Sequence, residues 1–207
     1  MILKTLFEHA LSDEIDGKEF IDKTSAEKLF IFFKACKTFR WHDVNNDCED
    51  RANAICLLLD DWNITNAKAW VFSGYVFNKI GYLKNLWKYH VAAAIPVMQD
   101  GVLAYFIIDP ATSGHLTLLA DWAANVTDNP HSYHLVKNGK YYIFNDKKIK
   151  KNNWYKRNKG NYNWTMQGLS GINGISNIGK AQLAFLKSKV VKTKKDFAKL
   201  RYLNPLV

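Results

Sequence analysis

The chain has 207 residues, of which 48% are hydrophobic and 23% are charged, a composition that excludes a disordered protein. Its net charge of +10 favours acidic proteins, nucleic acid or anionic surfaces as partners but determines no fold. We expect one domain over residues 1–207, with a core at about 24–126 and a basic C-terminal extension at about 127–207.

The three cysteines Cys36, Cys48 and Cys56 contain no CxxC motif, so neither a disulfide framework nor a zinc site is expected. No apolar stretch approaches the roughly 18 residues of a membrane helix, and the first residues lack a signal-peptide pattern. We therefore expect a soluble protein without a transmembrane segment, either cytoplasmic or exported without a visible signal peptide as an effector.

Helices are expected in the N-terminal part of the chain. Residues Thr24 to Glu27 match a capping box, and the apolar run 29–39 follows as a buried helix. Asn45-Asn46-Asp47 offers N-caps for a second helix from about 47 to 62. One face of this second helix is apolar, with Ala52, Ile55, Cys56 and Leu59 at helical spacing.

After this helix the pattern becomes one of strands. Two β-rich apolar runs, 89–98 and 102–109, flank Asp100-Gly101, which is a strong signal for a two-residue hairpin. Such a turn pairs Gln99 with Val102. The remaining segments predict a strand at 67–77 with a turn at Ser73-Gly74, a helix at 116–126, a second hairpin around Asn138-Gly139, and a helix from Gly179 to about Leu200. This order of elements indicates an α+β fold with N-terminal helices packed on an antiparallel sheet.

Cys48 is the candidate nucleophile, because it lies in the first turn of the second predicted helix. A helix N-terminus lowers the pKa of a thiol, and its free N–H groups can stabilise an oxyanion. A small buried core residue is the alternative interpretation of Cys48, and it is the preferred one for Cys36 and Cys56.

A base and an orienting acid are predicted from the hairpin. In the register that pairs Gln99 with Val102, His90 and Asp109 lie on one face as diagonal neighbours, within reach of a hydrogen bond. A one-residue shift of the register would place them on opposite faces. Taken singly, His90 could be a structural histidine and Asp109 a turn residue, whereas together with Cys48 they indicate a triad.

Three segments resemble the bacterial protein glutaminases: Asn46-Asp47-Cys48-Glu49-Asp50-Arg51-Ala52, Trp87-Lys88-Tyr89-His90-Val91-Ala92, and Ile107-Ile108-Asp109-Pro110-Ala111. The resemblance covers about residues 40–125 and extends to Trp122. It implies a papain-like or transglutaminase-like core with Cys48 as nucleophile, His90 as base and Asp109 as orienting acid. Two features depart from the family pattern: Asp47 stands where glycine is expected, and Glu49-Asp50 adds two acids beside the cysteine.

Further residues are candidates for the site. His42 and Asn46 are rival oxyanion donors, and Asp47 precedes the nucleophile. Aromatic residues that would line the entry for a glutamine side chain are Trp41, Tyr75, Trp87 and Tyr89, although core packing is the alternative role for each.

The resemblance implies hydrolysis of the side-chain amide of protein-bound glutamine through a thioester, with an acidic protein as substrate and with neither metal nor organic cofactor. Cysteine peptidases, isopeptidases and transglutaminases use the same triad and remain alternatives. A nucleic-acid binding protein is the alternative from another class, because Trp154 and Tyr155 interrupt a basic run at 147–159. A solvated basic loop is the preferred interpretation of that run. The oligomeric state is not predicted.

Overall fold

The structure is a computed structural model that describes residues 18–43, 48–77, 86–99, 101–127, 133–144, 154–156, 159–172 and 179–207. The first half contains α2 (Lys23–Ala35), the 3-10 helix η1 (Lys37–Phe39), α3 (Cys48–Asp61), β1 (Ala67–Phe77), β2 (Leu86–Gln99) and β3 (Val102–Ile108). The second half contains β4 (Thr117–Leu118), α4 (Leu119–Val126), β5 (Tyr133–Asn138), β6 (Tyr141–Phe144), β7 (Trp154–Lys156), α5 (Lys159–Leu169) and α6 (Lys180–Leu200). Among the described helices, none has the length and apolar character needed to cross a membrane.

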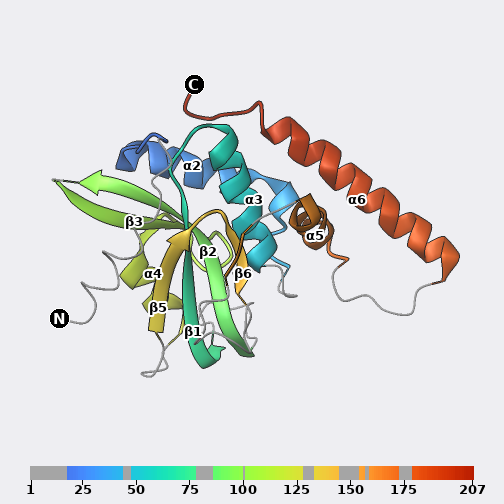
Figure 1. Ribbon diagram of the computed structural model, residues 1–207, viewed down its shortest axis with the longest axis horizontal. Coiled ribbons are helices and arrows are strands. Elements are labelled where there is room, and N and C mark those ends of the chain that lie inside the picture. Colours follow the sequence, from blue (N-terminus) through green and yellow to red (C-terminus); the bar gives the residue numbers. More distant parts are fainter. Residues whose placement is uncertain are drawn as a thin grey trace.

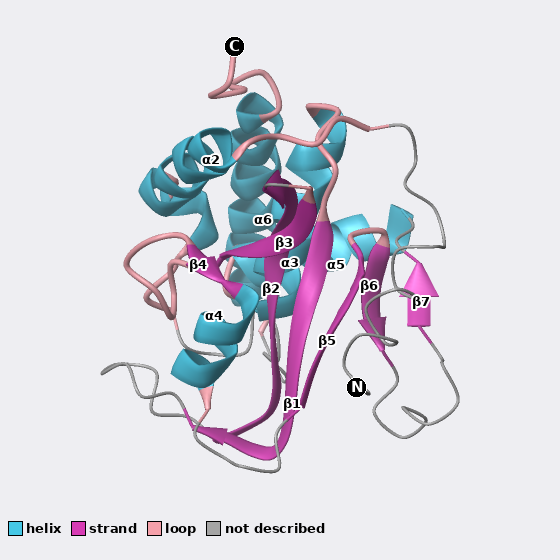
Figure 2. Cartoon of the chain, turned by 90° about the vertical axis from the view of Figure 1, so that its left-hand side faces the viewer, coloured by secondary structure: helices cyan, strands magenta, loops and turns pink. Residues whose placement is uncertain are grey.

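The centre of the fold is a five-stranded antiparallel sheet (Figure 1), and its strand order, β4-β3-β2-β1-β5, can be followed in Figure 2. Helices α2 and α3 cover one face, and their side chains form the main core with alternate residues of β2 and β3. Helix α4 covers the other face with Trp122 and Val126. The expected α+β fold, with N-terminal helices on an antiparallel sheet, is confirmed.

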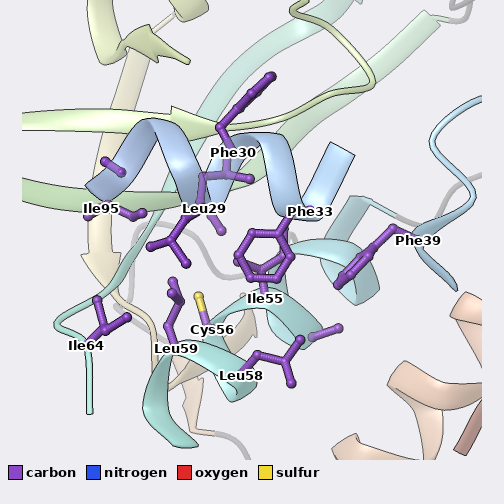
Figure 3. Close-up of a cluster of buried hydrophobic side chains, with 14 of the residues drawn as sticks. Leu29, Phe30, Phe33, Phe39, Ile55, Cys56, Leu58, Leu59, Ile64 and Ile95 are labelled. Carbon is purple, nitrogen blue, oxygen red and sulfur yellow. The ribbon is translucent and has the colours of Figure 1, made fainter. Parts of the chain in front are cut away.

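The main core is aromatic in α2 and aliphatic in α3 (Figure 3). Phe33 of α2 packs edge-to-face on Phe39, with ring centroids 5.5 Å apart, and lies beside Ile55 of α3. Cys56 also points into this core and is fully buried, as the structural interpretation of this cysteine predicted. The packed core fixes α3 against the sheet, and α3 in turn fixes the position of Cys48 at its first residue.

Helix α2 begins at Lys23, well before the predicted apolar run at 29–39, and is capped by a residue other than Thr24. Asp22 is the N-cap, and its carboxylate accepts the backbone N–H of Ser25 at 2.7 Å. The predicted capping box at Thr24 is therefore wrong, because an aspartate two residues earlier provides the acceptor. The helix also ends at Ala35, and residues 37–39 form the separate η1.

The β2–β3 hairpin has the predicted register. Gln99 pairs with Val102 and Ala93 with Ile108, while Gly101 has the positive φ of 76° that a two-residue turn requires. The predicted turn at Ser73-Gly74 is wrong, since β1 continues through it. The ladder between β1 and β2 instead shifts register between Phe72 and Val76, as at a β-bulge.

The predicted hairpin around Asn138-Gly139 is also wrong. Strand β5 pairs with β1 in the central sheet, whereas β6 pairs with β7 in a separate two-stranded sheet (Figure 2). The Gly139 N–H donates to the Asn66 carbonyl at 3.3 Å, and a Cβ at this glycine would lie 1.8 Å from Asn66 Oδ1. This close approach to Asn66 directs the chain out of the first sheet, so that the Asn-Gly pair does not close a hairpin.

Of the two C-terminal helices, α5 packs beside α3, and α6 packs beside α5 and η1. Helix α5, which the sequence did not predict, places Met166 and Leu169 in the main core. Helix α6 has its predicted bounds, starts after Gly179, and lies along one side of the molecule next to α5 (Figure 1). Phe197 is its most buried side chain among those described, at 1% exposure.

Candidate active site

His90 and Asp109 form a buried pair on the face of the sheet that α4 covers. His90 Nε2 lies 2.8 Å from Asp109 Oδ2, and the two side chains are 1% and 5% exposed. The hairpin register places Asp109 directly after β3 and diagonal to His90 on β2. The contact therefore follows from the two-residue turn at the far end of the hairpin.

The Asp109 carboxylate accepts two further hydrogen bonds on the same oxygen. Thr112 Oγ1 donates at 2.5 Å and Trp122 Nε1 at 3.0 Å. Burial works to raise the pKa of Asp109, but the charge of His90 and the hydrogen bonds from His90, Thr112 and Trp122 hold it below its usual value. Asp109 is thus an anion at neutral pH that fixes the His90 ring with an N–H at Nε2.

Trp122 and Thr112 complete this pair from two different elements. The Trp122 ring lies 5.7 Å from the His90 ring, so α4 contacts both members of the pair. The family resemblance extends to Trp122, whereas the role of Thr112 was not predicted. Its signal is the Asp-Pro-Ala-Thr turn, in which the Thr112 N–H returns to the Asp109 carbonyl at 3.0 Å and brings the hydroxyl to the carboxylate.

Cys48 is the first residue of α3 and lies beside strand β2. It packs against Ala52, Trp70, Phe72 and Val91, and the backbone N–H of Val91 hydrogen-bonds to its sulfur. The β2–β3 ladder begins at Ala93, so Val91 lies beyond the end of β3 and its N–H is not needed by that strand. This contact holds the sulfur next to the residue that follows His90.

The thiol of Cys48 donates to Glu49 Oε2 at 3.3 Å. Burial and the neighbouring Glu49 charge raise the pKa of Cys48 well above its usual value, against the opposite effects of Arg51 and the Val91 N–H. The sequence predicted a lowered thiol pKa at the helix N-terminus. That expectation is wrong for this structure, because burial and the adjacent Glu49 carboxylate raise the pKa more than Arg51 and the Val91 N–H lower it.

Glu49 also connects the cysteine to β2. Its second oxygen, Oε1, accepts a hydrogen bond from the hydroxyl of Tyr89. Tyr89 is half-buried and lies against Trp70, with ring centroids 5.7 Å apart. Tyr89, expected to line the entry of the site, therefore lies at the site and contacts the residue beside Cys48.

Arg51 provides a buried positive charge one turn into α3. Its guanidinium lies 5.9 Å from the Trp41 ring and donates to the Asp43 carbonyl at 3.2 Å. This cation lowers the pKa of Cys48, although less than burial and Glu49 raise it.

The other candidate residues have different positions. Trp41 lies in the main core, where its Nε1 donates to the Phe33 carbonyl at 2.8 Å. His42 is exposed and lines a cavity of about 540 Å³ between α2 and the segment that leads to α3. Asn46 and Asp47 lie outside the described residues. Tyr75 and Trp87 lie on β1 and β2, where the structure describes their backbone alone. In the described part of the chain, no three His, Cys, Asp or Glu side chains form a cluster that would hold a metal ion.

A protein-family model described as "Glutaminase" matches residues 19–126, which is just over half of the chain and includes Cys48, His90 and Asp109. No curated protein matches the chain in sequence.

Solved structures of protein-glutaminases have a similar fold. A crystal structure of a mutant of pro-protein-glutaminase matches with a TM-score of 0.62 and 17% identity, over 81% of this chain and 64% of that chain. The NMR structure of protein-glutaminase from Chryseobacterium proteolyticum matches with a TM-score of 0.58 and 17% identity, over 78% of this chain and 92% of that chain. A crystal structure of protein-glutaminase matches with a TM-score of 0.61 and 18% identity, over 79% of this chain and 93% of that chain. This chain thus spans less than two thirds of the length of the mutant pro-protein-glutaminase and most of the length of the two protein-glutaminases.

Proposed function

Because the chain belongs to the glutaminase family, we propose that it hydrolyses the side-chain amide of protein-bound glutamine to glutamate and ammonia, with Cys48, His90 and Asp109 as its triad. The observation that carries this proposal is the buried His90–Asp109 pair next to Val91, whose N–H holds the Cys48 sulfur. A thiol served by a base that a carboxylate orients is the arrangement of a nucleophilic cysteine hydrolase.

The first half of the reaction forms a thioester. Asp109 accepts from Nε2, which leaves Nδ1 of His90 to take the proton of the Cys48 thiol. The sulfur attacks the carboxamide carbon of glutamine, and a carbon–sulfur bond forms while the carbonyl oxygen becomes an oxyanion. His90 then gives its proton to the nitrogen, the carbon–nitrogen bond breaks, and ammonia leaves.

The second half returns the enzyme to its starting state. Water gives a proton to His90 and attacks the thioester carbon, the carbon–sulfur bond breaks, and the sulfur recovers its proton from His90. One amide and one water become one carboxylic acid and one ammonia. Free N–H groups in the first turn of α3 are the proposed oxyanion donors.

The raised thiol pKa is compatible with this reaction. Cys48 is a thiol in the resting site, so its proton must pass to His90 as substrate binds and excludes water. The proposed mechanism therefore uses His90 as a general base for each turnover, rather than a thiolate that exists beforehand.

The test is the identity of the products. We expect the wild-type protein to release ammonia from an unfolded acidic protein such as casein and to leave its chain length unchanged. Mass spectrometry of the digested substrate should find glutamine converted to glutamate. Cys48→Ala should abolish both signals, while Cys36→Ala, which alters a half-buried thiol outside the site, should keep them.

Each other outcome identifies an alternative. A cut substrate chain would indicate a peptidase, and an amine adduct that accompanies ammonia would indicate a transglutaminase. Faster release of ammonia from free glutamine than from protein would indicate a small-molecule amidase and contradict the proposed substrate class.

A further inference from the structure

Glu49 has contacts that the triad does not require. One carboxylate oxygen accepts the Cys48 thiol at 3.3 Å, and the other accepts the Tyr89 hydroxyl. Tyr89 directly precedes His90 on β2, so Glu49 bridges the first turn of α3 and the strand that carries the base. The carboxylate is therefore held beside the reacting sulfur by two donors from two elements.

A carboxylate in this position opposes activation of the nucleophile. Its charge and its hydrogen bond both favour the neutral thiol over the thiolate. An isolated nucleophilic cysteine would be better served by a neutral or cationic neighbour at this place. The position of Glu49 is accordingly better explained if a group of the substrate binds to its carboxylate during the reaction.

The leaving amide of a glutamine side chain is such a group. A carboxylate accepts hydrogen bonds and does not donate them, whereas a carboxamide nitrogen carries two donors. That nitrogen is bonded directly to the carbon that the sulfur attacks. An acceptor within hydrogen-bond distance of Sγ is therefore within reach of the amide nitrogen when the carbon approaches the sulfur.

We propose that Glu49 determines the selectivity of the site for an amide: its Oε2 accepts the NH₂ group of the substrate glutamine and its charge rejects the carboxylate of the product glutamate. Tyr89 is the positioning residue that holds Oε1 and so aims Oε2. When the thiol proton passes to His90, Oε2 exchanges the S–H donor for the substrate N–H donor. This inference rests on the proposed deamidation.

The same charge explains how product would leave. Hydrolysis replaces the NH₂ group, a donor, with a carboxylate oxygen, an acceptor with negative charge. Two carboxylates would then share a half-buried site, and their repulsion favours dissociation. Glu49 thus accepts a hydrogen bond from the neutral substrate amide and repels the negatively charged carboxylate of the product.

The experiment measures binding in proteins that cannot turn over. Two fluorescent peptides of identical sequence, one with glutamine and one with glutamate at the central position, are titrated into the Cys48→Ala variant. We expect the glutamine peptide to bind at least about tenfold more tightly, the scale of one hydrogen bond to a charged group. In Cys48→Ala/Glu49→Gln the ratio should fall to near one, because an amide neither repels a carboxylate nor prefers an amide.

Matched variants make the result specific. Glu27→Gln, added to Cys48→Ala, removes the same charge from an exposed position of α2 and should keep the preference for glutamine. Tyr89→Phe, added to Cys48→Ala, should reduce the preference only in part, since Glu49 keeps its charge but loses one partner. A preference that persists unchanged in the Glu49→Gln protein, or equal binding of both peptides by the Cys48→Ala parent, would overturn the inference.

Failure of the proposed reaction has a different signature. The wild-type protein could release no ammonia although the Cys48→Ala variant prefers the glutamine peptide and loses this preference with Glu49→Gln. The proposed deamidation would then be wrong, while the proposed role of Glu49 in amide binding would be supported. If ammonia is released but Glu49→Gln leaves the ratio unchanged, the reaction stands and the role of Glu49 is wrong.

Discussion

Trp122 Nε1 donates to the same Asp109 oxygen that faces His90, at 3.0 Å, and it also lies 3.2 Å from Thr112 Oγ1. The indole N–H of Trp122 is therefore shared between the Asp109 carboxylate and the Thr112 hydroxyl, which itself donates to that carboxylate. The three donors that converge on Asp109 Oδ2 come from β2, the turn after β3, and α4. Small changes in this group should have measurable effects on both stability and activity.

Thr112→Val should destabilise the protein by about 1–3 kcal/mol, because it removes a buried hydroxyl that donates to a charged group. Thr117→Val is the matched control. Thr117 is 6% exposed, and its hydroxyl has no hydrogen-bond partner in the described part of the structure. Its replacement should be neutral or stabilising, and urea unfolding of both variants checks the difference. Equal losses in the two variants would contradict the importance of the Thr112–Asp109 contact.

Trp122→Phe should shift the pH dependence of stability. The pKa of Asp109 is depressed in the fold, so its carboxylate stabilises the protein above its ordinary pKa, and this stabilisation disappears as the pH falls through the depressed value. Without the indole donor the pKa should rise, so that stability should be lost at a higher pH. Unfolding measured from neutral pH to about pH 3 tests this shift. Trp164→Phe changes a tryptophan that is 56% exposed, and it should leave the profile unaltered.

Alkylation of Cys48 should be slow at neutral pH and should accelerate as the pH rises, because only the thiolate reacts and its pKa is raised. Glu49→Gln removes the charge that favours the thiol, so alkylation at neutral pH should increase by about tenfold, the effect of one pKa unit. Iodoacetamide labelling followed by peptide mapping measures the rate at each cysteine. Burial raises the pKa of Cys36 to about 11, so this thiol serves as an internal reference. A rate that does not respond to Glu49→Gln would contradict the electrostatic effect.

The attachment of α6 should depend on Phe197 more than on its ion pair. Phe197 is 1% exposed and packs against Tyr162, and its change to alanine should cost about 3–5 kcal/mol. Arg201 contacts Asp61 at 2.5 and 2.6 Å, but its side chain is 53% exposed, so Asp61→Asn should cost less than about 1 kcal/mol. Thermal unfolding compares the two variants, and the reverse order would contradict this assignment.

Ammonia release from an acidic unfolded protein should decrease as salt is added. The net charge of +10 favours encounter with an acidic substrate, and ions screen that attraction beyond about 10 Å at 0.1 M salt. A neutral glutamine peptide should show little dependence on salt and provides the control. The same salt dependence for both substrates would exclude electrostatic attraction as its cause.

The β2–β3 register and the His90–Asp109 contact were predictable because a two-residue Asp-Gly turn leaves one pairing, and strand geometry then fixes the diagonal neighbours. The same reasoning failed at Asn138-Gly139, where pairing with the open edge of β1 and contact with Asn66 determine the path. The link from Glu49 to Tyr89 was not predictable, since it depends on the distance between α3 and β2. The raised pKa of Cys48 was missed for a similar reason: burial of the thiol depends on the packing of the whole sheet.

Lys68 bears on whether the N-terminal half can fold alone. This lysine is 1% exposed, and its ammonium contacts Asn53 Oδ1 at 3.0 Å and the Tyr141 carbonyl at 2.5 Å. Asn53 in turn donates to Thr165 of α5 at 2.8 Å. A fragment that ends at residue 126 would retain the candidate triad but would lose Tyr141 and Thr165, together with strand β5 at the edge of the sheet. The Lys68 ammonium would lose the Tyr141 carbonyl as an acceptor, and Asn53 would lose the Thr165 hydroxyl. Lys68 and Asn53 therefore tie the half of the chain that carries the candidate triad to its C-terminal third, and we expect a fragment that ends at residue 126 to be less stable than the whole chain.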